Sequence, residues 1–322
     1  MAHELEADHH GHSADSPREI PRAGWWSLAK RVYSSNNAKN LSLLAAGIAF
    51  YAMLAIFPAL AALVAIYGLL ANPATIQHEI NAIRGVIPGE AQNLIATYLT
   101  SIVSTSPSKL GIGLIVSILV ALYYARSGTV SLIEALNVTY EEREKRGVLH
   151  FELVAMLIMA GAGIFVIIAL LLIAAWPAAL RFLPFSGATK TIGAIAPWPI
   201  LIAMLAAALA TTYRFAPSRS EVKWRWVSGG AVAASALWIA GSAGFTFYVA
   251  KFGNYGKSFG ALGAVVVLLT WLYLTAYAIL IGACLDAEME RQTTRDTTRP
   301  PERPMGRGGA KMTDTAADDD HP

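Results

Sequence analysis

Six long stretches of this chain contain no Asp, Glu, Lys, Arg or His, and together they account for 147 of its 322 residues. They are residues 41–71, 110–125, 153–176, 191–213, 226–250 and 258–285. The charged 15% of the chain is therefore confined to the segments between them, whereas soluble domains carry about 25% charge. This segregation excludes a soluble globular enzyme and a disordered chain. It indicates a polytopic membrane protein.

The stretch lengths predict the architecture, because a helix needs about 20 apolar residues to cross a membrane. We predict an all-α bundle of six transmembrane helices with additional interfacial amphipathic helices. The first stretch is long, and Pro58 within it is a candidate hinge because proline removes a backbone donor. The second has only 16 residues, so we expect its helix to continue past Arg126; a re-entrant segment is the alternative. The membrane domain is expected over 25–292, between disordered tails at 1–24 and 293–322.

The basic residues predict the orientation. Nineteen of the 25 Lys and Arg residues lie in the four segments that six spans place on the same side as both termini, and six lie on the other side. Basic residues favour the cytoplasmic side, so both termini are expected in the cytoplasm. No cleavable signal peptide is recognisable in the first forty residues.

Two segments outside the spans have helical periodicity. Residues 25–33 predict an amphipathic helix on the inner leaflet, with Trp25, Trp26, Leu28, Ala29, Val32 and Tyr33 on one face. Residues 72–109 predict two further amphipathic helices, separated at Pro88-Gly89.

Polar and small residues supply the site candidates. Arg126, Glu134 and Asn137 share a helical face where the second span leaves the membrane, and we interpret them as an inner polar gate. A solvated or helix-capping face is the alternative. Gly256 and Gly260 are candidates for a hinge or for close packing, and Asn254 and Tyr255 for an outer mouth. Close helix packing is also expected at Gly161, Gly163, Gly241 and Gly244.

The other motifs do not indicate chemistry. His10, His12 and Asp15 have the spacing of a metallo-hydrolase motif but follow no strand, and Gly256-Lys257-Ser258 lacks the glycine that a P-loop needs. We therefore expect no catalytic residues, no metal site and no cofactor. The net charge of +3 is too small to indicate a nucleic-acid partner. The uncharged spans also argue against ion-driven transport.

Four segments resemble the YihY/BrkB family of bacterial inner-membrane proteins. They are AAGIAFYAMLAIFPAL (45–60), RSGTVSLIEALNVTYEEREKR (126–146), YRFAPSRSEVKWRWVSGGAVAASALW (213–238) and NYGKSFGALGAVVVLLTWLYLTAYAILIGACLDAEMER (254–291). The resemblance implies a six-span helical protein of the bacterial inner membrane. The family has carried a virulence-factor label and a ribonuclease BN label, but it offers no agreed catalytic residues. This chain has no carboxylate cluster, metal-ligand set or basic nucleic-acid groove in its sequence pattern to support a ribonuclease.

Our leading hypothesis is a multi-pass inner-membrane protein that transports or accommodates a lipid-like or amphiphilic substrate, with membrane lipids as partners. The alternative is a non-transporting scaffold or envelope-homeostasis factor, and an intramembrane enzyme ranks last. A homo-oligomer is compatible with the sequence.

Overall fold

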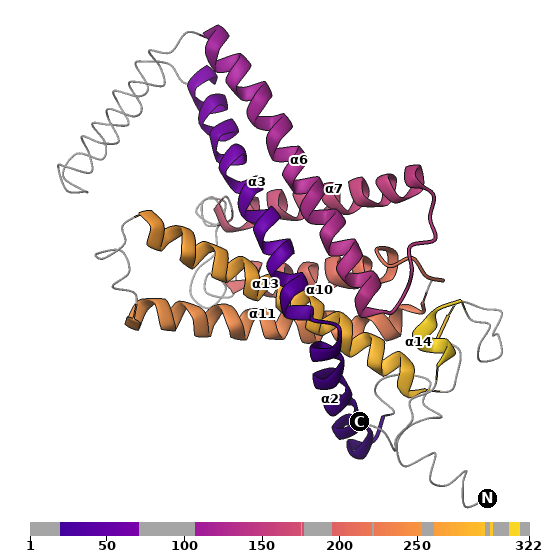
Figure 1. Ribbon diagram of the computed structural model, residues 1–322. Helices are drawn as coiled ribbons and strands as arrows, with labels where there is room; N and C mark the ends of the chain where they lie inside the picture. The colour runs from indigo at the N-terminus through magenta and orange to yellow at the C-terminus, as the bar shows by residue number, and fades with distance from the viewer. Residues whose placement is uncertain are drawn as a thin grey trace, which may run out of the picture. The chain divides into compact units, whose positions relative to one another are not determined.

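The computed structural model describes residues 20–70, 107–174, 176, 195–220, 222–252, 261–293, 297–298 and 309–315 (Figure 1). In these residues the chain is helical, with one isolated backbone bridge between Val222 and Thr298. The helices are α2 (Arg22–Ala38), α3 (Leu41–Leu70), α6 (Pro107–Thr139), α7 (Val148–Ala174), α10 (Pro197–Phe215), α11 (Trp224–Phe252), α13 (Ala261–Gln292) and α14 (Lys311–Asp314).

Among the described residues, six helices are long and apolar enough to cross a membrane, which confirms the predicted all-α bundle with six transmembrane helices. The candidate spans are Leu41–Leu63, Gly111–Thr139, Val148–Ile173, Pro197–Phe215, Trp226–Lys251 and Gly263–Gln292. The expected continuation of the second span is also confirmed, because α6 is one helix of 33 residues that runs past Arg126. Helix α3 is likewise continuous through Pro58.

The chain forms two compact units. The smaller comprises Tyr51–Ser127, and the larger comprises the residues before and after it. In the smaller unit, Ile112, Ile115 and Leu119 are largely exposed, as expected for side chains that face lipid in a spanning helix. The larger unit holds the main hydrophobic core, which is built around α13 and includes Leu136, Tyr213, Trp226 and Leu280.

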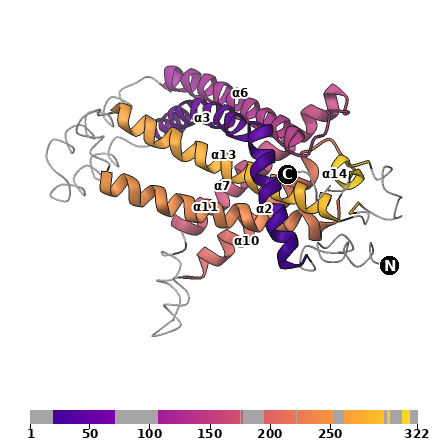
Figure 2. The same cartoon turned by 60° about the horizontal axis from the view of Figure 1, so that its bottom comes forward.

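Helices α11 and α13 lie side by side in both ribbon views (Figures 1 and 2) and approach closely at two glycines. A Cβ atom added to Gly230 would lie 2.1 Å from the carbonyl oxygen of Gly282. One added to Gly282 would lie 2.5 Å from the Cβ atom of Ala234. Small residues permit such backbone approach between helices in a membrane.

Four of the glycines at which the sequence predicts close packing do not provide it within the described part of the chain. An added Cβ atom would meet nothing within 4 Å among the described residues at Gly161, Gly163, Gly241 or Gly244. That expectation was wrong for these four positions, because small size permits close packing but does not select the partner helix. The contact is made instead at Gly230 and Gly282.

Helix α2 packs on α13, although the sequence predicts that its whole apolar face lies on the inner leaflet. Leu28 is buried and Val32 packs against the same core, whereas Trp26 and Tyr33 are 68% and 72% exposed. The predicted apolar face is therefore divided. One part contacts α13, and the aromatic part remains available to the membrane interface.

Candidate functional site

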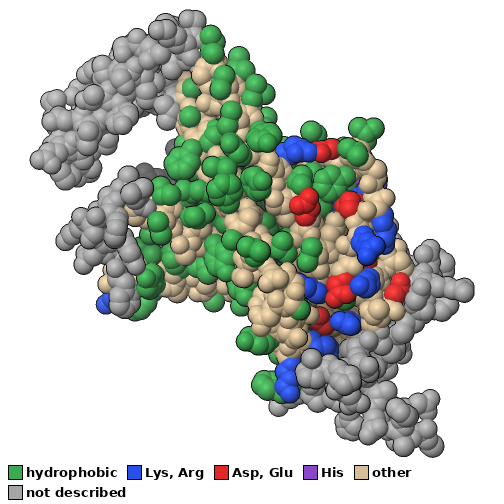
Figure 3. Space-filling model, in the orientation of Figure 1, with side chains coloured by type: hydrophobic (Ala, Val, Ile, Leu, Met, Phe, Trp, Pro, Cys, Tyr) green, Lys and Arg blue, Asp and Glu red, His purple; other side chains and the backbone are tan. Residues whose placement is uncertain are grey.

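Acidic side chains lie buried in the last turns of α13. Asp286, Glu288 and Glu290 each have 0% exposure, although the sequence places them after the last span. Figure 3 shows most of the visible red and blue side chains gathered on one part of the surface. A buried charge is costly unless it is paired. The contacts of these three carboxylates therefore explain how α13 accommodates them in buried positions.

Glu290 forms a buried ion pair with Arg219, from the connection between α10 and α11. The Arg219 Nη1 and Glu290 Oε2 atoms are 2.6 Å apart, and the two side chains are 1% and 0% exposed. The guanidinium carbon of Arg219 lies 3.8 Å from the centre of the Tyr140 ring. Burial tends to lower the pKa of Arg219, but the charge and hydrogen bond of Glu290, together with Tyr140 and Asp286, outweigh it and raise the pKa. Arg219 therefore remains a fixed cation that holds the α10–α11 connection against α13.

The other two carboxylates join α13 to α11 and α2. The Gly230 backbone N–H donates to Asp286 Oδ1 at 2.6 Å. Glu288 Oε2 lies 3.3 Å from Arg31 Nε, and Glu288 Oε1 accepts a hydrogen bond from Ser35 at 2.6 Å. These contacts explain why α13 remains helical and buried beyond the predicted end of the span.

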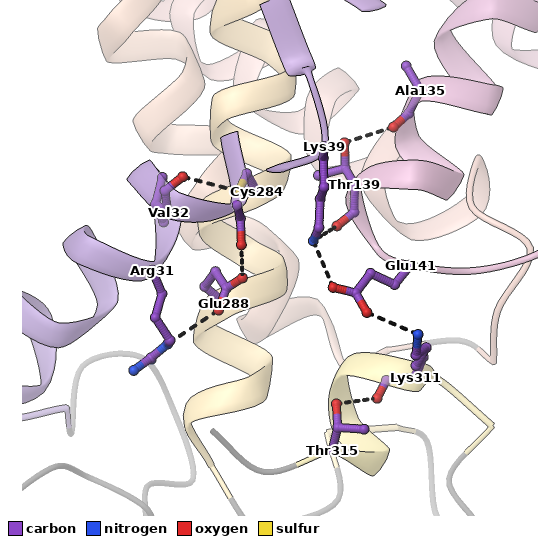
Figure 4. Close-up of polar contacts among 11 residues, drawn as sticks. Arg31, Val32, Lys39, Ala135, Thr139, Glu141, Cys284, Glu288, Lys311 and Thr315 are labelled. Carbon is purple, nitrogen blue, oxygen red and sulfur yellow. Dashed lines mark hydrogen bonds and ion pairs between the residues drawn. The ribbon is translucent and has the colours of Figure 1, made fainter. Parts of the chain in front are cut away.

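A separate set of ion pairs fastens part of the C-terminal tail (Figure 4). Glu141 lies between two ammonium groups, with Oε1 at 3.2 Å from Lys39 Nζ and Oε2 at 3.0 Å from Lys311 Nζ. Burial tends to raise the pKa of Glu141, but the hydrogen bond from Lys311 and the charge of Lys39 lower it overall. The Lys311 backbone N–H also donates to Glu142 Oε1 at 2.6 Å. Residues 309–315, in a tail for which the sequence predicts disorder, are thus fastened to the bundle.

A groove of about 1180 Å³ runs between α7 and α10, within the larger unit. Its apolar part is lined by residues that include Val154, Leu157, Ile158, Phe165, Leu205 and Leu209. Its other end is lined by Lys145, Arg146, His150, Arg214 and Arg219. No Asp or Glu is among the described residues that line it. We call this feature the basic groove.

The basic end is held in a defined arrangement. Arg146 Nη2 lies 2.8 Å from Glu144 Oε2 and also donates to the Ala216 carbonyl oxygen at 2.8 Å. The hydrogen bonds from Arg146 lower the pKa of Glu144 to about 2. The Arg214 guanidinium lies 4.5 Å from the centre of the Trp224 ring. Lys145 has a side chain that is 63% exposed, with its Nζ 3.0 Å from Glu142.

Asn137, one of the three predicted gate residues, is a structural link. Its Nδ2 donates to Glu144 Oε2 at 3.0 Å, and its Oδ1 accepts the Ser218 N–H at 2.8 Å. It is buried, whereas Glu134 is exposed on the same helix. Arg126 belongs to the other compact unit. The gating role of the three residues stays a prediction, and the contacts of Asn137 show that it fastens α6 to the α10–α11 connection.

Several predicted features lie outside the described residues. They are the hinge and mouth candidates Asn254, Tyr255, Gly256 and Gly260, most of the 72–109 segment and the His-rich tail. Among the described residues, no group of three or more His, Cys, Asp or Glu is placed to hold a metal ion.

Sequence reasoning missed Asp286, Glu290 and Arg219, the ion-pair partner of Glu290. One signal was available. Asp286 and Glu290 are four residues apart in DAEMERQ, which follows Cys284 without Gly or Pro and so favours continuation of the last helix.

Residues 32–306 match the family described as Virulence factor BrkB. A protein of Bacillus subtilis (strain 168), YfkH, whose name describes it as ribonuclease-like, is 26% identical over 271 residues, which cover 83% of this chain and 96% of that protein. A UPF0761 membrane protein of Kangiella koreensis is 25% identical, covering 82% of this chain and 64% of its own length. UPF0761 membrane protein IL2447 of Idiomarina loihiensis is 36% identical over 78 residues, which are 24% of this chain and 27% of that one. No solved structure matches the chain.

Proposed function

The chain belongs to the Virulence factor BrkB family of membrane proteins, and from its basic groove we propose that it accommodates a lipid-like amphiphile. One observation carries the proposal: the groove is apolar along α7 and α10 and basic where these helices meet the α10–α11 connection. An amphiphile has the same division, with an apolar chain joined to a polar head.

The dimensions of the groove suit such a molecule. Lining residues on α7 extend from His150 to Phe165, a rise of about 22 Å at 1.5 Å per residue. The hydrocarbon core of a bilayer is about 30 Å thick, so the groove extends beyond the depth of one leaflet. Its volume of about 1180 Å³ exceeds the roughly 300–1,000 Å³ of ordinary small-molecule pockets.

The proposed orientation puts both termini in the cytoplasm of a bacterial cell. It is supported by the distribution of Lys and Arg, with 19 on the proposed inner side and six on the outer side. Lys145, Arg146 and Arg219 then lie at the inner leaflet, and the amphiphile enters the groove from that leaflet. A topology reporter fused after residue 322 tests this orientation. A reporter that is active only outside the cytoplasm would contradict it.

The proposal can be tested by filling the groove. Gly161 lines the groove, and among the described residues a Cβ atom added there meets no neighbour within 4 Å, so the side chain of Gly161→Leu should start without a clash and reduce the groove volume. Gly163→Leu is the matched control, because Gly163 has equal space on the same helix and does not line the groove. Native mass spectrometry of each purified variant measures the lipid that it retains.

We expect the wild type and Gly163→Leu to retain lipid, and Gly161→Leu to lose most of it. Equal retention by the two variants, or none by the wild type, would contradict the proposal. The alternative of a scaffold that recruits partners through its tail receives less support, because Lys311 and Met312 of that tail already pack on the chain itself.

A further inference from the structure

We infer that the amphiphile bound in the basic groove carries an anionic, phosphate-bearing head group, as an acidic phospholipid of the inner leaflet does. This inference rests on the proposed function and adds the chemical class of the ligand. Its first support is the asymmetry of the lining, where Lys145, Arg146, Arg214 and Arg219 contribute basic groups and no described carboxylate contributes.

The carboxylates near this end pair with the basic groups themselves but do not line the groove. Glu290 is fully buried against Arg219, and Glu144 is held by Arg146 and by Asn137. Glu142 accepts the backbone N–H of Lys311 in addition to pairing with Lys145. Because the basic residues line the groove and these carboxylates do not, an anion in the groove meets the basic member of each pair.

The basic groups are also held in place before a ligand arrives. Two hydrogen bonds fix the connections that carry them: the Lys145 backbone N–H donates to Ser218 Oγ at 3.0 Å, and the Ser218 backbone N–H donates to Asn137 at 2.8 Å. The Arg214 guanidinium packs on the Trp224 ring, and that of Arg219 on the Tyr140 ring. Binding to such a site orders fewer side chains, so less of the interaction energy is lost.

Continuity with the apolar part of the groove favours a lipid over a free anion. Arg214 and Leu209 lie on one helix and both line the same groove, so a ligand head and its chain occupy one site. Phosphate oxygens accept hydrogen bonds from guanidinium and ammonium groups, and these charge-assisted bonds are stronger than neutral ones.

The test compares two lipids that differ only in their head group. Purified protein is exchanged into mixed micelles with phosphatidylglycerol or phosphatidylcholine of identical acyl chains, and the bound fraction is measured by native mass spectrometry. The variants are Lys145→Gln, at the rim of the groove, and Lys30→Gln, an exposed lysine on α2 that does not line it. Both variants remove the same charge, so general attraction to an anionic surface affects them equally.

We expect phosphatidylglycerol to be retained at least five-fold better than phosphatidylcholine. Lys145→Gln should lower that preference several-fold, whereas Lys30→Gln should leave it unchanged. Equal retention of the two lipids, or equal effects of the two variants, would overturn the inference. A competition experiment with millimolar inorganic phosphate distinguishes a lipid site from a free-anion site. If phosphate releases phosphatidylglycerol and binds Gly161→Leu as tightly as the wild type, the site binds free anions and the inference is overturned.

The two proposals fail in different ways. If the wild type retains neither lipid, the proposed function fails. If it retains both lipids equally and Gly161→Leu retains neither, the proposed function stands and the inference about the head group fails.

Discussion

Replacing Gly230 by alanine should weaken the contact between α11 and α13. The new methyl carbon would lie 2.1 Å from the Gly282 carbonyl oxygen and 2.5 Å from the Asp286 carboxyl carbon. Carbon atoms in favourable contact lie about 3.5–4.0 Å apart, so the two helices must separate by more than about 1 Å. That movement also stretches the 2.6 Å hydrogen bond from the Gly230 N–H to Asp286.

The magnitude follows from three effects. Overpacking costs about 1–3 kcal/mol, and weakening a hydrogen bond to a buried charged group costs about 1.5–3 kcal/mol. Alanine gains about 1 kcal/mol over glycine in helix propensity. We therefore expect Gly230→Ala to lower the free energy of unfolding by roughly 1.5–5 kcal/mol. In the described part of the chain, Gly241→Ala on the same helix meets no neighbour within 4 Å, so this variant should keep the gain in helix propensity.

Tryptophan fluorescence during heating in detergent is a suitable assay. Trp238 on α11 and Trp271 on α13 lie with ring centres 6.2 Å apart, and each donates a hydrogen bond to the opposite helix. Their emission therefore reports the separation of these two helices. We expect Gly230→Ala to unfold at a lower midpoint temperature than the wild type. Gly241→Ala should unfold at the wild-type midpoint temperature or above it. A midpoint for Gly230→Ala equal to or above that of Gly241→Ala would refute the reasoning.

Two further predictions concern the carboxylates Glu290 and Glu144 and their arginine partners. Glu290→Met leaves the buried Arg219 cation without its partner and should cost about 3–5 kcal/mol of unfolding free energy. The double variant Arg219→Met/Glu290→Met should recover most of that loss in thermal unfolding, and a double variant no more stable than the single one would contradict this explanation. The pKa of Glu144 is lowered from 4.5 to about 2 by Arg146, so its stabilising contact is complete above about pH 4.5 and is lost as the pH falls towards 2. The protection of the amides of residues 140–147 against hydrogen exchange, corrected for the intrinsic pH dependence of exchange, should therefore fall between about pH 4.5 and pH 2 in the wild type, with a smaller change in Glu144→Gln.

The membrane architecture is predictable from sequence because it depends on a local property. Each span must satisfy its own backbone hydrogen bonds and present apolar side chains to lipid, so hydropathy locates a helix without knowledge of its neighbours. The same reasoning explains why α6 continues past Arg126. The backbone hydrogen bonds of a helix do not depend on the side chain, so one charged residue does not end it. Charge counting ends the last span at residue 285 and does not reveal that α13 continues as a buried helix through Asp286 and Glu290.

The contacts that build the site are not local, which explains why the sequence did not reveal them. Gly230 and Gly241 are both helical glycines in an apolar stretch, and only the position of α13 distinguishes them. Arg219 is one of several basic residues in a short connection, and its pairing with Glu290 depends on how α10, α11 and α13 meet. Asn137 was selected as a polar residue, but its partners from residues 144 and 218 could not be inferred from helical spacing.

The packing of α2 on α13 has a consequence for biosynthesis. Ser35 and Glu288 are 253 residues apart in the chain, and ribosomes add about 5–20 residues per second. Once α2 has been made, it therefore waits about 13 to 50 s before its partner helix exists. During that interval Leu28 and Val32 have no α13 to cover them. The amphipathic character of α2 then serves assembly as well as the finished fold, because the membrane surface shelters the helix until the last span arrives.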